Sequence, residues 1–205
     1  MSNRADNAQY LLAILTEMGQ QQCNPVLLSL PEPDKITLKQ KYYIDPIQAD
    51  RVSLKIFYHC HSYPDKDDHE HGHFHLFIHI KDQTDWKHLA ALSMSHNGQP
   101  IEWLTVNQWV TDSPFTDNDD LMTLIEHIAE LEPDDLLHAW FIAMINLYQQ
   151  ELQILLEKRD QELSKIKSLS ADTDILKNKE IYSLSHYNID LKTTLSNALS
   201  EINIS

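Results

Sequence analysis

The chain has 205 residues, of which 42% are apolar, and it carries a formal charge of −15 at neutral pH with only three glycines. This length suits one domain with a substantial core, or one domain with an appendage, and the composition excludes a fibrous or disordered chain. A protein that neutralises phosphates needs a basic surface, so the acidic balance speaks against nucleic acid as a partner. The apolar stretches are too short to cross a bilayer, and residues 1–22 show no cleavable signal pattern, so we expect a cytoplasmic protein without membrane contact.

The first expected element is a helix near the start of the chain, capped by Asn3 or Asp6 and ended by Gly19 and Asn24-Pro25. Its apolar residues fall at helical spacing. The pattern of residues 36–43 fits a short helix or a strand equally well, and Asp45-Pro46 ends that segment.

Two segments then alternate at the period of a β-strand. From Val52 to His61 the even-numbered residues are mostly apolar, and the run from His71 to Ile80 keeps the same parity. One face of each strand should therefore be core. The other face presents imidazoles, which are common transition-metal ligands and the usual acid/base groups near neutral pH. The odd-numbered residues of the second run are His71, His73, His75, Phe77 and His79.

If these two strands pair antiparallel, His61 can lie opposite His73 and His59 opposite His75. Cross-strand neighbours have Cβ atoms roughly 4.5–5.5 Å apart. Imidazoles at that spacing can share one metal ion, whose bonds to nitrogen are about 2.0–2.1 Å long. The sequence thus predicts one sheet face that carries four candidate metal ligands, His59, His61, His73 and His75.

A second hairpin is expected from residues 89–95 and 101–111, joined across Asn97-Gly98, a strong turn signal. The antiparallel sheet would then have about four strands. If the odd-numbered face of the last strand is the histidine face, its tryptophans wall a pocket. Asn107 and Thr111 would supply polar groups there, beside Trp103 and Trp109.

Beyond Pro114 the apolar period becomes helical. We expect a helix that starts at residues 117–120, a longer one from Asp134 to about Lys167, and a last one whose stripe includes Ile181 and Leu184. The fold class is α+β, an antiparallel sheet with helices at the N-terminus and in the C-terminal half. Residues 1–168 would form the domain and residues 169–205 a helical extension, packed on it or on a partner, so a homodimer is one expected arrangement.

The predicted cofactor is a transition metal, with zinc or iron as the first candidates. Three nitrogens and an open position suit catalytic zinc, two histidines with a carboxylate suit non-haem iron, and four closed ligands suit a structural site. Glu70 and His71 are candidate acid/base residues or auxiliary ligands, and Cys60 is a candidate ligand or redox-sensitive thiol. The competing interpretation is that these histidines merely decorate an exposed strand or bind metal adventitiously. His88 and His96, at the ends of the third strand, are further candidates to complete the site, although lone histidines at strand ends are more often exposed.

Two other chemistries use similar histidine runs. His71 to Phe77 resembles the motif of histidine-triad nucleotide hydrolases, in which one histidine attacks phosphorus. The run His73 to Ile78 is also similar to the HUH endonuclease motif, which needs a helical tyrosine such as Tyr148 or Tyr187, but the acidic charge disfavours DNA.

The order of segments resembles an uncharacterised bacterial family, defined only as a domain of unknown function. The resemblance covers most of the chain beyond about Asp45, with its most specific stretches at residues 70–75 and 107–111, and it implies no established activity. At Asp112-Ser113-Pro114 this chain departs slightly from the more polar segment of that family. The segments that carry the resemblance are 58–61, 70–75, 88–89, 93–94, 98–101, 107–111, 159–160 and 189–191.

The sequence therefore predicts a metal-binding protein of unknown activity, either a metal-dependent hydrolase or an oxidoreductase acting on a small-molecule substrate. The alternatives are a histidine-triad-like nucleotide hydrolase or transferase, and a noncatalytic metal-sensing or interaction protein.

Overall fold

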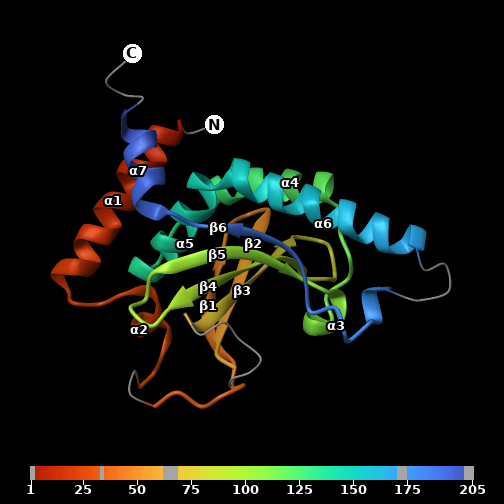
Figure 1. Cartoon of the computed structure of the whole chain (residues 1–205). Helices are drawn as coiled ribbons and strands as arrows, with labels where there is room; N and C mark the ends of the chain where they lie inside the picture. The colour runs from red at the N-terminus through yellow and green to blue at the C-terminus, as the bar shows by residue number, and fades with distance from the viewer. Residues whose placement is uncertain (1–2, 33–34, 62–68, 170–174, 201–205) are drawn as a thin grey trace.

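An antiparallel sheet runs through the centre of the molecule, with its strands side by side in chain order (Figure 1). The computed structural model describes residues 3–32, 35–61, 69–169 and 175–200. In this part of the chain the sheet has six strands: β1 (Tyr42–Gln48), β2 (Val52–His59), β3 (Glu70–Ile80), β4 (Lys87–Ser95), β5 (Pro100–Val106) and β6 (Ser183–Asn188).

Helices cover one face of this sheet. Helices α4, α5 and α6 lie over it, and α1 packs against α5 and α7 at one end (Figure 1). The short helix α3 lies on the other side, where it packs on the turn η2. The helical elements are α1 (Arg4–Gln20), α2 (Pro25–Ser29), α3 (Gln108–Thr111), α4 (Asn118–Glu126), η1 (His127–Glu130), α5 (Leu136–Leu147), α6 (Gln149–Leu169), η2 (Ile175–Lys177) and α7 (Leu191–Ser200).

The main core lies between the sheet and the helices. Even-numbered residues of β2 and β3, such as Leu54, Ile56 and Leu76, point into it as the alternation predicts. Trp140 and Phe141 of α5 meet Phe74 of β3 there, with the Phe74 and Phe141 ring centres 4.9 Å apart. The opposite sheet face has its own small apolar cluster, made of Ala91, Leu104 and Val106. Both faces are therefore partly buried, and the second one carries the histidines.

The ambiguous segment 36–43 forms neither a helix nor a full strand: residues 36–41 are turn and irregular backbone, and strand β1 begins only at Tyr42. The expectation that Asp45-Pro46 ends this segment is wrong, because β1 continues to Gln48. Pro46 lies within β1, at a position where the register with β2 shifts between Ile44 and Ile47. Proline cannot donate a ladder hydrogen bond, so an edge strand with a bulge is where a sheet accepts it.

The α+β class and the antiparallel sheet are confirmed, but the expected number of strands, about four, is wrong. The edge strands β1 and β6 are the additions. Residues 183–188 were expected in a helical stripe and instead form β6, which pairs with β5, whereas α7 begins at Leu191 as Asp190 suggests. Residues 108–111 form α3 rather than the end of a strand, because the Asn107 side chain caps the helix.

The long helix expected from Asp134 to Lys167 is interrupted. Helix α5 ends at Leu147 and α6 begins at Gln149, with Tyr148 between them at φ −102° and ψ 19°. The apolar period continues across the break, which is why the sequence pattern does not show it. Among the described residues, none of the helices combines the length and apolar character needed to span a bilayer.

Candidate metal centre

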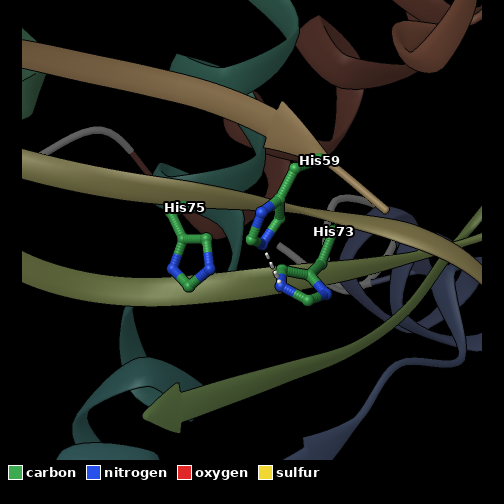
Figure 2. A group of neighbouring side chains, drawn as sticks. All are labelled: His59, His73 and His75. Atoms are coloured by element: carbon green, nitrogen blue, oxygen red, sulfur yellow. Dashed lines mark hydrogen bonds between the residues drawn. The ribbon is translucent and has the colours of Figure 1, made fainter. Parts of the chain in front are cut away.

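Three buried histidines converge on the sheet face away from the main core. His59 lies on β2, and His73 and His75 lie on β3, with their rings turned toward one another (Figure 2). Each offers a ring nitrogen, and these atoms lie within 4.8 Å of one another. A cluster of this kind can hold a metal ion. We call these three residues the histidine cluster.

The register that builds the cluster differs from the expected one by two residues. His59 pairs with His73, and His75 pairs with Phe57, so the predicted pairs His61 with His73 and His59 with His75 are wrong. Strand parity fixes the face of each side chain but not the pairing, because a shift of two residues keeps every side chain on its face. The observed register brings the rings of His59 and His73 together, with their Nε2 atoms 2.8 Å apart (Figure 2).

Burial disfavours the charged form of two of these imidazoles. It lowers the pKa of His59 to about 3, an effect that neighbouring His73 and His61 reinforce. It also lowers the pKa of His75 well below the usual value. A neutral imidazole has a lone pair for a metal, whereas a protonated one has none. His59 and His75 are therefore in the protonation state that a metal ligand needs.

Two further side chains hold the cluster from behind. Glu70 Oε1 lies 2.5 Å from His73 Nδ1. This carboxylate can accept a hydrogen bond from the Nδ1–H group, which leaves the Nε2 lone pair of His73 available for a metal. His88 Nε2 lies 3.0 Å from His75 Nδ1. The Ser113 hydroxyl in turn accepts a 2.9 Å hydrogen bond from the His88 backbone N–H. Partners of this kind fix the tautomer and orientation of metal-binding histidines.

His61, the fourth predicted ligand, lies beside the cluster. Its ring centre is 4.6 Å from that of His59 and 5.3 Å from that of His73. It is half-buried, and with His59 it lines a neighbouring pocket that includes Trp109. His61 thus stands between the cluster and the pocket.

His71 points elsewhere, although strand parity assigns it to the histidine face. Its Nδ1 lies 2.6 Å from the Tyr58 hydroxyl, and its ring centre is 5.2 Å from that of His96. The pairing of β3 with β4 shifts between Glu70 and Gly72, and this irregularity breaks the alternation at His71. His79, further along β3, contacts the Gln83 carbonyl at 2.5 Å.

The tryptophans and Asn107 occupy positions other than those expected. Trp103 is fully buried in the main core, on the opposite face of the sheet. Trp109 does line a pocket beside the histidines, but from α3. The Asn107 amide donates to backbone carbonyls, including that of Ile175 at 2.8 Å, and Thr111 ends α3. The preference of asparagine for helix N-caps was the signal that could have placed Asn107 correctly.

Of the two strand-end histidines considered as additions to the site, His88 is the one that joins it. It is half-buried against His75 and Phe77, although histidines at strand ends are more often exposed. Burial, followed by the nearby Arg159 guanidinium, lowers its pKa to about 3. Cys60 is buried, forms no disulfide bond and lies outside the cluster.

Neither candidate tyrosine of the endonuclease interpretation lies near the histidines. Tyr148 is buried in the main core with its ring centre 6.5 Å from that of Trp103. Tyr187 pairs with Trp103 across β5 and β6, so it faces the same side. Both tyrosines therefore lie on the sheet face opposite the histidines.

The fold and site define an α+β protein whose antiparallel sheet is covered by helices on one face and holds a buried histidine cluster on the other. Residues 5–189 match the family model described as "Domain of unknown function (DUF6969)", and the chain belongs to this family. The expected resemblance to a domain of unknown function is thereby confirmed. Neither the curated proteins nor the solved structures include a significant match.

Proposed function

We propose that the protein binds one divalent transition metal through His59, His73 and His75, with zinc as the first candidate and an open coordination position facing the pocket beside His61. The single observation that carries this proposal is the geometry of the cluster, in which ligand atoms from three buried imidazoles lie within 4.8 Å of one another. Nitrogens around tetrahedral zinc, with bonds of about 2.0–2.1 Å, lie about 3.3 Å apart. The ligand atoms of the cluster would have to move closer together by up to about 1.5 Å to reach that arrangement.

The energetics of burial support a ligand role. Three polar rings occupy the interior of a sheet face, where apolar side chains could have filled the space at no desolvation cost. His59, His73 and His75 are 8%, 4% and 1% exposed. A row of histidines that merely decorated a strand would be exposed to solvent.

The chemistry of the ligand set favours zinc over non-haem iron. Glu70 holds His73 by its Nδ1 atom and is thus engaged as a supporting carboxylate, which leaves nitrogens as the available ligands. Zinc held by three nitrogens acts as a Lewis acid on a bound water or substrate oxygen, the arrangement used for hydrolysis. We therefore propose metal-dependent hydrolysis of a small molecule as the reaction class.

His61 is the group best placed to exchange a proton at the open position. It lies beside His59 but outside the group of three, and it lines the pocket from which a substrate would arrive. In this proposal Glu70 orients His73, and His71 has no role in catalysis because it contacts Tyr58 and His96.

Metal analysis of protein purified without a histidine tag tests the proposal. We expect about one metal per chain in the wild type and in His79→Ala, which removes an imidazole from the same strand but outside the cluster. His73→Ala/His75→Ala should contain none. Substoichiometric metal that is unchanged in the double variant would overturn the proposal.

Cobalt substitution tests the open position and the role of His61. A visible spectrum that shifts on addition of azide shows an exchangeable ligand, and His61→Ala should keep the metal and this response. A closed four-nitrogen spectrum in the wild type that opens only in His61→Ala would make His61 a ligand and the site structural.

A further inference from the structure

A pocket of about 560 Å³ opens directly beside the histidine cluster. His59 and His61 form the wall that it shares with the cluster, so a molecule in the pocket can reach the metal position that the proposed function leaves open. His75 and His73 are more deeply buried than His59, which makes this side the approach to the site. The described lining residues are Lys39, Lys41, His59, His61, Trp109, Val110, Lys179 and Tyr182.

The charge of the pocket lining is opposite in sign to the net charge of the chain. Acidic residues outnumber lysines and arginines by 31 to 16 in the chain. Among the described residues that line the pocket, however, carboxylates are absent and three lysines come together, Lys39 and Lys41 from one segment and Lys179 from a distant one. Such local clustering creates a positive potential that concentrates small anions.

Contacts place two of these lysines, Lys41 and Lys39, beside the cluster. Lys41 Nζ lies 4.8 Å from the centre of the Phe57 ring, which itself lies 5.0 Å from the His75 ring. Lys39 has a left-handed backbone with φ +64°, and its N–H donates a 2.9 Å hydrogen bond to the Cys60 carbonyl. A non-glycine residue in this conformation costs about 1 kcal/mol, so the fold holds Lys39 beside the end of β2 against a local preference.

The opposite wall is aromatic and rigid. Trp109 Nε1 donates a 2.8 Å hydrogen bond to the Ile181 carbonyl, and its ring centre lies 5.9 Å from that of Tyr182. Tyr182 in turn meets the His61 ring edge-on at 6.2 Å. A flat apolar body can lie against this wall while a charged group faces the lysines and the cluster.

The charge balance at the cluster also favours an anionic ligand in this pocket. Three imidazole ligands bring no negative charge, so only the Glu70 carboxylate behind His73 would offset the charge of a divalent metal, and the lysines add positive charge. An anion at the open position would be stabilised by both.

We propose that the pocket binds a small organic anion, a carboxylate or phosphate on an apolar or aromatic body, with its oxyanion between the lysines and the metal. This inference rests on the proposed metal site and names the substrate class for it. The lysines act as point charges, so they can bind either a carboxylate or a phosphate.

Calorimetry on zinc-loaded protein of measured metal content tests this inference, with phenylphosphonate, benzoate and neutral benzyl alcohol as probes. We expect at least one anion to bind, the alcohol to bind at least tenfold more weakly, and anion affinity to fall as salt is raised. Comparison of the two anions distinguishes phosphate from carboxylate preference. Equal binding of the alcohol and both anions would overturn the inference.

Charge reversal locates the site. Lys41→Glu/Lys179→Glu should lose at least tenfold in anion affinity, whereas Lys165→Glu/Lys158→Glu, an equal change on α6, should not. Equal losses in both would overturn the inference, as would unchanged anion affinity in the metal-free His73→Ala/His75→Ala variant. Stoichiometric zinc without anion binding refutes this inference alone, whereas absence of zinc refutes the proposed function.

Discussion

Single residues decide how well the histidine cluster is oriented. Glu70 makes the shortest of the contacts behind it, 2.5 Å from His73 Nδ1. Supporting carboxylates of this kind raise the basicity of the ligand nitrogen and lock the ring, and their loss typically lowers metal affinity 10–100-fold.

Glu70→Gln should therefore lower zinc affinity about tenfold or more while the fold is kept, because the amide retains the shape of the side chain but not its charge. Competition with a chromophoric chelator measures the affinity. Glu102→Gln is the matched control, since Glu102 contacts His186 at 3.1 Å on a strand distant from the cluster. Equal affinities for all three proteins would contradict the orienting role of Glu70.

Buried imidazoles also predict how the metal-free protein responds to acid. Burial lowers the pKa of His59 and of His88 to about 3, whereas both titrate near 6.5 when unfolded. The unfolded state then binds more protons below pH 6.5, so the free energy of unfolding falls as pH drops toward the folded pKa. Above pH 6.5 both groups are neutral in either state and the effect vanishes.

His59 and His88 should each lower the free energy of unfolding by about 2 kcal/mol at pH 5 relative to pH 7.5. Urea unfolding of chelator-treated protein at the two pH values measures this loss. His88→Gln should show a smaller loss than the wild type, while His127→Gln, on the helical side of the molecule, should not differ from it. A wild-type stability that falls between pH 7.5 and pH 5 no more than that of His88→Gln would refute the assignment.

At the scale of elements, the irregular start of β3 shapes the site. A Cβ on Gly72 would lie 2.6 Å from both the His59 carbonyl oxygen and the Tyr58 hydroxyl. The His59 backbone cannot move without moving a ligand of the cluster. Gly72 thus allows the close approach of β2 and β3 at the point where the histidines meet.

Gly72→Ala should lower the free energy of unfolding by about 1–3 kcal/mol, as overpacking does, and weaken zinc binding as well. Chemical denaturation and chelator competition measure the two effects. Gly19→Ala is a matched control, because its Cβ would meet no atom within 4 Å and helix α1 should gain up to about 1 kcal/mol. A Gly72→Ala protein as stable as the wild type would mean that β2 and β3 separate readily.

Sequence periodicity identifies elements best where one face is buried. The parity of β2 and β3 predicted which residues share the histidine face, and Asn3 marked the start of α1. The sequence pattern gave a wrong prediction at α3. Trp109, Val110 and Thr111 favour a strand locally, but the Asn107 side chain caps a helical turn instead. The short strand β6 owes its existence to pairing with β5, which local pattern does not reveal.

At the scale of the whole molecule, one face of the sheet contributes to stability and the other carries the candidate site. Its helix-covered face holds the main core, and its other face holds the cluster, the supporting residues and the lysine-lined pocket. Sequence could indicate four histidines on one face, but not whether His88 or His96 would join them or that Lys39 and Lys179 would line the same pocket. Those contacts depend on strand register and on loops that come together only in the folded chain.

Because the ligands come from two paired interior strands of the sheet, β2 and β3, metal binding should stabilise the entire fold. A metal that binds only the folded state at 100 times its Kd adds about 2.7 kcal/mol. For a chain of this size, that corresponds to a rise in Tm of roughly 5–11 °C. Thermal unfolding of chelator-treated protein with and without added zinc measures the shift. His79→Ala should retain the shift and His73→Ala/His75→Ala should lose it, whereas an equal shift in both variants would place the metal outside the cluster.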